Sequence, residues 1–184
     1  MRVLAPHAEG VAAAWNDDGV EVQSFRYAPE RLEVLGYSRS LSADETVRGT
    51  AGAVAPFYAL AARFALSAEC KRQEYDLVHA HWVVPNGIVA GLAGVEAPLA
   101  VGLHGSDVFM AEKPLFRPWV RKALRQAGLV TGCSPELVER VCKVGFDRSR
   151  AEVIPYGVDV EQFSPDPARR EIWRRKLDLP PDAV

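Results

Sequence analysis

Residues 98–107 carry the sequence PLAVGLHGSD, which joins an apolar run to a polar turn. The run over 98–103 is apolar at nearly every position, as is typical of a strand that a parallel sheet covers on both faces. Histidine, glycine, serine and aspartate follow it, and these residue types favour a turn. We therefore predict a buried strand that leads into a polar loop at its carboxyl end.

Three further segments repeat this pattern of an apolar run followed by a polar turn. They are residues 76–82 (DLVHAHW), 128–132 (GLVTG) and 151–154 (AEVI). Helical spacing in the intervals predicts helices over 85–94, 114–127 and 134–144, the last with Ser134 as its N-cap. Because such strands and helices alternate, the expected fold class is α/β, a Rossmann-like, three-layer parallel sheet flanked by helices.

The N-terminal part of the chain lacks this regular alternation. We predict strands over 2–6 and 20–27, with a turn at 16–19 (NDDG) between them. Residues 28–49 show no clean periodicity and are expected to form a loop with some helix. From residue 50 to about residue 72, the spacing of alanine, leucine and phenylalanine predicts a helix.

The C-terminal part of the chain is typical of a linker. A turn at 163–167 precedes a strongly charged helix, which we predict over 168–177, and a Pro-Pro pair follows. The predicted domains are residues 1–163, an N-terminal Rossmann-like domain, and residues 164–184, a linker with a short helix.

Composition excludes several classes of protein. The chain has 184 residues, of which 48% are apolar, so it can bury a core and is not a disordered chain. A net charge of −2 argues against a broad basic surface for nucleic acid, and we predict no nucleic-acid partner. Three cysteines without C-x-x-C spacing, and a start without a signal-peptide core, favour a reducing, cytoplasmic location.

The apolar window 50–70 is the strongest candidate for contact with a membrane. Pro56, Arg63 and Glu69 interrupt it, so it is a weaker candidate for a spanning helix than an unbroken run of ~20 apolar residues. We expect a buried or partly buried helix. The alternative is a helix that rests on the membrane surface, peripheral to its inner face. The basic residues near the headgroups would then be Arg48, Arg63, Lys71 and Arg72.

Polar and aromatic residues follow the four predicted central strands, where ligands of an open parallel sheet bind. They are His81 and Trp82, His104 to Asp107, Cys133 and Ser134, and Tyr156 and Gly157. Gly105 allows a tight turn, and Ser106 or Asp107 could cap the next segment and leave backbone N–H groups for an anion. An ordinary loop, with a capping aspartate and a histidine bonded to a carbonyl, explains the same residues.

Histidines offer a second type of chemistry. His79 and His81 are two apart on a predicted strand, so they share a face and could supply two metal ligands. No further ligand stands at a supporting spacing, and we predict no metal site. A metal hydrolase built on His79, His81 and His104 remains an alternative. The sequence contains no G-x-S-x-G, G-x-G-x-x-G or P-loop motif.

Three motifs together resemble the GT-B glycosyltransferases of the glycogen-synthase-like group, glycosyltransferase family 4. These are residues 75–82 with Pro85-Asn86-Gly87, residues 98–107, and residues 153–159 with Phe163 and Pro165. The resemblance implies that the chain is the N-terminal half of a GT-B fold, which mainly binds the acceptor. It also implies a partner half that binds a nucleotide-sugar donor, with a glycan, lipid-linked or small-molecule acceptor and no cofactor.

The resemblance also implies roles for individual residues. His104 matches the histidine of the family near the transferred sugar, and it is the predicted catalytic residue. The predicted substrate-binding residues are His81, Asn86, Gly105, Ser106, Asp107, Ser134, Tyr156, Gly157 and Asp159.

Two departures from the family pattern shape the expected behaviour. The opening strand matches the second strand of the family, so the first βα unit is expected to be missing, and the nucleotide-binding domain of the family is expected to be absent from these 184 residues. We therefore expect the isolated chain to be inactive. An uncovered sheet edge favours association into a homodimer. The alternative to an enzyme domain is a stand-alone Rossmann-like module for binding or scaffolding.

Overall fold

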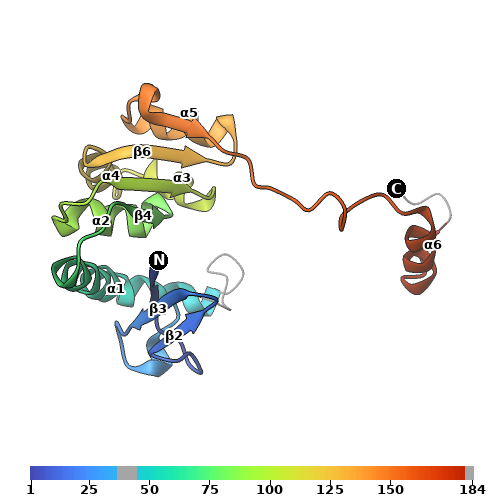
Figure 1. Ribbon diagram of the computed structural model, residues 1–184, viewed down its shortest axis with the longest axis horizontal. Helices are drawn as coiled ribbons and strands as arrows, with labels where there is room; N and C mark the ends of the chain where they lie inside the picture. Colours follow the sequence, from blue (N-terminus) through green and yellow to red (C-terminus); the bar gives the residue numbers. More distant parts are fainter. Residues whose placement is uncertain (37–44, 181–184) are drawn as a thin grey trace. The chain divides into compact units, whose positions relative to one another are not determined.

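The computed structural model describes residues 1–36 and 45–180, except for the side chains of residues 45–48. The chain divides into two compact units, residues 1–154 and residues 155–184 (Figure 1). The first unit holds two β-sheets of the described residues. Each unit is described by itself.

The larger sheet has four parallel strands in the order β4-β5-β6-β7. The strands are β4 (Val78–His81), β5 (Leu99–Leu103), β6 (Ala127–Gly132) and β7 (Ala151–Val153). The helices between them are α2 (Ile88–Ala93), α3 (Ser106–Ala111), α4 (Arg117–Leu124) and α5 (Pro135–Val144). This parallel sheet flanked by helices confirms the predicted α/β, Rossmann-like fold class.

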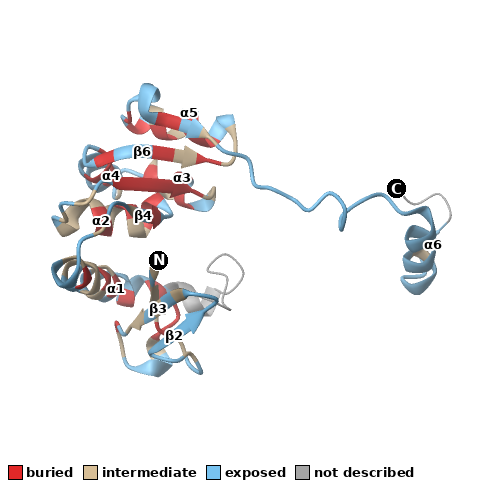
Figure 2. Cartoon of the chain, in the orientation of Figure 1, coloured by how far each residue is buried: buried red, intermediate tan, exposed pale blue. Residues whose placement is uncertain are grey.

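Strand β5 lies at the centre of the main hydrophobic core. All five of its residues are buried, and Figure 2 shows the strand in red. Fully buried valines from the flanking helices and strands pack around it; they are Val83, Val108, Val120, Val130, Val138 and Val141. The unbroken apolar run over residues 98–103 therefore reflects burial on both faces of the sheet.

Strand register aligns the carboxyl ends of the central strands. His81 pairs with Gly102, and Leu103 pairs with Gly132. Gly132 in turn pairs with Val153 of β7. The segments that follow these strands therefore leave the sheet at one edge, as predicted for a ligand-binding edge.

The smaller sheet contains β1 (Arg2–Pro6), β2 (Ala14–Asp17) and β3 (Val20–Phe25) in the order β1-β3-β2. Strand β3 runs parallel to β1 and antiparallel to β2. The predicted turn is confirmed, with Asp18 and Gly19 at φ of 46° and 86° in a tight hairpin. Strand β2 was not predicted, because its four residues are exposed and carry no apolar alternation.

The long helix α1 (Glu45–Arg72) covers the smaller sheet. It starts five residues before the predicted position at Thr50 and ends at the predicted Arg72. Its buried Tyr58 contacts Phe25 and Tyr27 edge to face, with ring centroids 5.5 Å and 5.3 Å apart. Aromatic pairs in this geometry add about 0.5–1.5 kcal/mol beyond simple burial. A short 3-10 helix, Glu30–Leu32, precedes α1.

Two central helices differ from their predicted bounds. The helix predicted over 114–127 is the shorter α4, and α3 directly after β5 was not predicted. Residues Val83–Gly87 form an irregular helical turn before α2. Helix α5 begins as predicted, with the Ser134 side chain accepting a hydrogen bond from the N–H of Leu137. A 3-10 turn, Arg148–Arg150, leads into β7.

The second unit contains α6 (Pro167–Lys176), close to the predicted helix over 168–177. Asp166 is its N-cap and accepts hydrogen bonds from the N–H groups of Ala168 and Arg169. None of the residues in α6 is buried. The predicted domain boundary between residues 163 and 164 stays a prediction.

Helices α2 and α4 approach closely because α2 has a glycine at the contact. A Cβ atom on Gly91 would lie 2.6 Å from Cα of Ala123 and 2.8 Å from its carbonyl oxygen. We expect Gly91→Ala to force the helices apart and lower the free energy of unfolding by about 1–3 kcal/mol, measured by urea titration. Gly52→Ala on α1, where nothing lies within 4 Å of the new Cβ, is the matched control. Gly52→Ala should leave the free energy of unfolding unchanged or raise it. If both variants lose the same free energy of unfolding, the close approach of α2 and α4 does not depend on Gly91.

Candidate active site

Three histidine side chains gather at the carboxyl ends of β4 and β5. His79 and His81 flank the buried Ala80, so both lie on the same face of β4. His104 follows β5, and its Nε2 lies 3.0 Å from Nδ1 of His81. The ring centroids of His79 and His81 are 4.3 Å apart, and those of His81 and His104 are 5.2 Å apart. The predicted catalytic His104 and the predicted substrate-binding His81 are therefore in direct contact.

Gly102 makes room for this histidine cluster, His79, His81 and His104. A Cβ atom on Gly102 would lie 3.1 Å from Nε2 of His79, 3.5 Å from Nδ1 of His81 and 3.6 Å from Nε2 of His104. Three ring nitrogens thus face the space above one glycine. A larger residue at position 102 would push the imidazoles apart.

The surroundings lower the pKa of two imidazoles in the cluster. Burial lowers the pKa of His79, and repulsion from His81 and His104 in their protonated forms lowers it further. Burial and then His81 lower the pKa of His104, while Asp107 opposes the change. Both pKa values fall below the ordinary 6.5, so both rings are neutral at pH 7. A neutral imidazole has one donor and one acceptor nitrogen, which suits it to bind a substrate hydroxyl.

The described residues were also compared with the arrangement that a metal ion needs. Within residues 1–36 and 45–180, no group of three or more His, Cys, Asp or Glu side chains could hold a metal ion. The alternative of a metal hydrolase on His79, His81 and His104 therefore finds no support in the described residues.

Asp107 ties the loops after β4 and β5 together. Its Oδ2 accepts a hydrogen bond from the N–H of Val83 at 2.7 Å. Its Oδ1 accepts from the N–H groups of His104 and Gly105, at 3.1 Å and 2.8 Å. The side chain is only 2% exposed, so the carboxylate is desolvated and fully used by backbone donors. Asp107 thus positions the His104 loop, and its predicted direct contact with substrate stays a prediction.

The predicted cap of the helix after β5 is wrong. Neither Ser106 nor Asp107 caps α3; its N-cap is Gly105, which provides no side-chain bond. Gly105 has a φ of 118°, a conformation that residues with a side chain rarely adopt, so the glycine is required by the turn. The Asp107 carboxylate accepts from the N–H groups of His104 and Gly105, which precede α3, and the expected anion contact of the N–H groups in α3 stays a prediction. Ser106 is exposed at the start of α3, and its predicted substrate contact stays a prediction.

Trp82 adds an aromatic wall beside the cluster. Its ring stands at 90° to that of His104, with centroids 6.0 Å apart. The residue has a φ of 71°, which costs about 1–3 kcal/mol for a non-glycine residue. Its N–H donates to the carbonyl of Gly102 at 2.8 Å and so fixes the end of β4 against β5. Strained residues held in this way cluster at functional sites.

Asn86 connects the site with α1. Its amide nitrogen donates to the carbonyl of His81 at 2.9 Å, and its Oδ1 accepts from the Tyr58 hydroxyl at 2.8 Å. Burial raises the pKa of Tyr58 to about 12, which keeps the hydroxyl protonated as the donor. Asn86 therefore holds the backbone of His81, and its predicted contact with the acceptor stays a prediction.

The remaining predicted residues fall in two places. Ser134 follows β6 at the same sheet edge and caps α5. Tyr156, Gly157 and Asp159 belong to the second unit, where Asp159 accepts from the N–H groups of residues 161 and 162 at 2.9 Å each. All three are exposed. Their predicted roles stay predictions.

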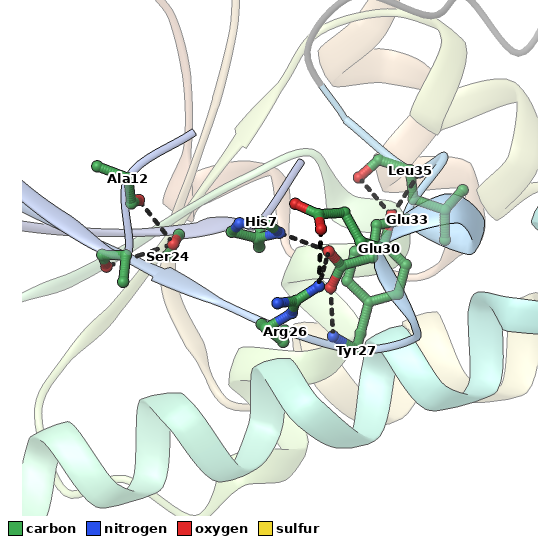
Figure 3. Close-up of polar contacts among 9 residues, drawn as sticks. His7, Ala12, Ser24, Arg26, Tyr27, Glu30, Glu33 and Leu35 are labelled. Atoms are coloured by element: carbon green, nitrogen blue, oxygen red, sulfur yellow. Dashed lines mark hydrogen bonds and ion pairs between the residues drawn. The ribbon is translucent and has the colours of Figure 1, made fainter. Parts of the chain in front are cut away.

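Sequence reasoning missed a buried histidine–glutamate pair at the end of β1. Figure 3 shows His7, Tyr27 and Arg26 converging on the Glu33 carboxylate. Nδ1 of His7 lies 2.5 Å from Oε2 of Glu33, and both residues are 8% exposed. The pair pins the segment after β3 to the carboxyl end of β1. The available signal was position, since His7 follows a predicted strand as His81 and His104 do.

Comparisons with known proteins agree on one family. The sequence model of Glycosyltransferase Family 4 matches residues 4–162. The putative teichuronic acid biosynthesis glycosyltransferase TuaC of Bacillus subtilis is 34% identical over 113 residues, which are 58% of this chain and 28% of TuaC. The N-acetyl-alpha-D-glucosaminyl L-malate synthase of Bacillus anthracis is 28% identical over 88 residues, which are 45% of this chain and 23% of that enzyme. The chain thus spans about a quarter of the length of these relatives.

Two solved structures share the fold. The Anabaena protein Alr3699/HepE in complex with UDP-glucose matches with a TM-score of 0.57 and 19% identity, over 87% of this chain and 37% of that chain. Sucrose-phosphate synthase from Thermosynechococcus elongatus matches with a TM-score of 0.60 and 15% identity, over 98% of this chain and 43% of that chain. Their likeness to this chain concerns architecture alone.

The lowered pKa values of His79 and His104 predict a pH-dependent stability. Because the unfolded chain binds more protons than the folded one, the free energy of unfolding should fall as pH falls from about 7.5 to about 5.5. Urea titrations at the two pH values measure the change. The double variant His79→Gln/His104→Gln should flatten it, whereas the control Trp119→Phe, at an exposed position of α4, should not. If the double variant keeps the pH dependence of the wild-type chain, His79 and His104 are not its cause.

Proposed function

The chain belongs to glycosyltransferase family 4, and we propose that it is the acceptor-side domain of an enzyme that uses a nucleotide-sugar donor. In this proposal the enzyme transfers a sugar to a glycan, a lipid-linked or a small-molecule acceptor. The observation that carries the proposal is the His104 loop, which Asp107 holds at the carboxyl edge of a parallel sheet. Ligands of such sheets bind at that edge.

His104 is the proposed catalytic residue. Its ring is neutral at pH 7 and only partly exposed, so it can donate to or accept from a sugar hydroxyl with little competition from water. His81 contacts its Nε2 and is the proposed positioning residue for the ring. Gly105 and Ser106 line the loop, and Ser134 stands at the next strand of the same edge. Fixed polar groups of this kind stabilise a transition state because they need not reorganise.

In this proposal, the nucleotide-sugar donor binds to residues outside these 184. Sugar transfer needs groups that stabilise the departing diphosphate, and the site described above holds no cationic side chain. The relatives TuaC and the malate synthase are about four times longer than the matched part. We therefore propose that a second domain binds the nucleotide sugar, that Tyr156, Gly157 and Asp159 approach it near the crossover, and that no cofactor is needed.

The proposed location is the cytoplasm, at the inner face of the membrane. The sheet edges also favour a homodimer, because β1 and β4 each pair on one side only among the described residues.

The proposed function is tested by transfer assays with labelled nucleotide sugars. The 184-residue chain alone should show no donor-dependent turnover, whereas a longer polypeptide that continues past Val184 into a donor-binding domain should transfer sugar. In that polypeptide, His104→Ala should lower kcat by about 10²-fold, as the loss of one preorganised polar group does elsewhere. Leu115→Ser, at a 74% exposed position, is the control and should keep full activity. Turnover by the chain alone, or full activity of His104→Ala, would contradict the proposal.

The homodimer is tested by light scattering across a range of concentrations. We expect a mass about twice the 20.2 kDa of one chain at high concentration. Strictly monomeric behaviour would rule out the edge pairing.

A further inference from the structure

Tyr58 on α1 links the apolar core beside the smaller sheet to the candidate active site. Its ring packs in a hydrophobic cluster with Phe25 and Tyr27, which contact it edge to face. The residue is only 5% exposed, yet its hydroxyl donates a hydrogen bond to Oδ1 of Asn86, in the turn before α2. A phenylalanine would fill the same apolar space, and a buried hydroxyl is costly without a partner. The hydroxyl of Tyr58 therefore serves the contact with Asn86.

The Asn86 amide extends this contact to the histidine cluster. Its Nδ2 donates to the carbonyl of His81 at 2.9 Å, and Nδ1 of His81 lies 3.0 Å from Nε2 of His104. An amide group has an acceptor at one end and a donor at the other. The Tyr58 donor and the His81 carbonyl therefore select the same orientation of the Asn86 amide. A continuous series of contacts leads from α1 to His104.

The Tyr58 ring is held in place from the side of the smaller sheet. Phe25 is the last residue of β3, and the N–H of Tyr27 donates to Oε1 of the buried Glu33 at 3.1 Å (Figure 3). Because protein cores are close-packed, a turn of the Tyr58 ring would displace both of the rings that contact it. The hydroxyl is therefore presented to Asn86 in a fixed direction.

We propose that Tyr58 is a positioning residue for the histidine cluster: its hydroxyl fixes the Asn86 amide, which holds the backbone of His81 so that the His81 ring meets His104. Tyr58 acts through Asn86 and not on a substrate. The consequence for catalysis rests on the proposed function, in which His104 is the catalytic residue. The arrangement of the histidines does not rest on it, and it is measurable in the 184-residue chain.

Loss of the hydroxyl should loosen the contact between His81 and His104. In Tyr58→Phe the ring stays, but Oδ1 of Asn86 loses its donor and the amide is free to turn away from the His81 carbonyl. His104 faces the rest of the histidine cluster and Asp107; burial and then His81 lower its pKa, and Asp107 opposes them. A looser contact weakens the repulsion from protonated His81, so the pKa of His104 should rise toward the ordinary 6.5.

The proposal is tested by NMR titration of the imidazole C–H groups in the 184-residue chain, with His104→Gln to assign the signal of His104. Tyr58→Phe should move the His104 midpoint to higher pH. The matched control is Tyr27→Phe, which removes a buried hydroxyl from the same cluster, one that accepts from the N–H of Leu35. Tyr27→Phe should lower the free energy of unfolding about as much as Tyr58→Phe does, and it should keep the wild-type midpoint of His104.

A double variant tests whether Tyr58 acts through Asn86. Asn86→Leu removes both hydrogen bonds of the amide and should move the His104 midpoint at least as far as Tyr58→Phe. Tyr58→Phe/Asn86→Leu should then move it no further than Asn86→Leu alone. Circular dichroism confirms that each variant is folded, and the two tyrosine variants decide the proposal by themselves if Asn86→Leu does not fold.

Three outcomes would overturn the proposal. They are a wild-type His104 midpoint in Tyr58→Phe, an equal change of the midpoint in Tyr27→Phe, and an added change in the double variant. In a longer polypeptide that transfers sugar, Tyr58→Phe should lower kcat by about three- to tenfold with KM unchanged, and Tyr27→Phe should keep both. If the NMR result holds and the wild-type polypeptide transfers no sugar, the proposed function fails and the positioning role of Tyr58 stands.

Discussion

The Asp107 carboxylate is the constraint on which the site depends. Its two oxygens accept hydrogen bonds from three backbone N–H groups, those of Val83, His104 and Gly105, and the residue is buried. Charge-assisted bonds of this kind are stronger than neutral ones, and they join two loops that hydrogen bonds of the sheet do not reach. With these loops fixed, His104 meets His81, Trp82 stands beside them, and Asn86 holds the backbone of His81 from the side of α1.

The central architecture could be predicted because burial leaves a clear trace in sequence. Strand β5 is apolar throughout since both of its faces are covered, and each parallel strand needs a helical return. Strand β2 and helix α3 could not be predicted. The first is wholly exposed and has no apolar pattern, and the second is six residues long and begins at a glycine without a capping side chain. Tertiary contacts, not local preference, hold such elements.

In the candidate site, too, some features could be predicted from the sequence and others could not. Position at a strand end was enough to select His81, His104 and Ser134, because parallel strands share one carboxyl edge. The hydrogen bonds of the Asp107 carboxylate to backbone N–H groups could not be predicted, since a sequence does not show whether a loop aspartate faces solvent or backbone donors. The spacing of two residues placed His79 on the face of His81, whereas the role of Gly102 follows from strand register, which pairs residues from separate segments. His7 with Glu33 likewise joins residues far apart in the chain.

The perpendicular contact between Trp82 and His104 has an optical consequence. A protonated imidazole quenches indole fluorescence more strongly than a neutral one, because it accepts an electron from the excited ring. Trp82 is close enough to His104, at 6.0 Å between centroids, to respond to the charge on that histidine. The other tryptophans lie on different elements, so replacing them with phenylalanine leaves Trp82 as the sole emitter. The protein thus contains an intrinsic fluorophore for the ionisation of His104, readable without label or substrate.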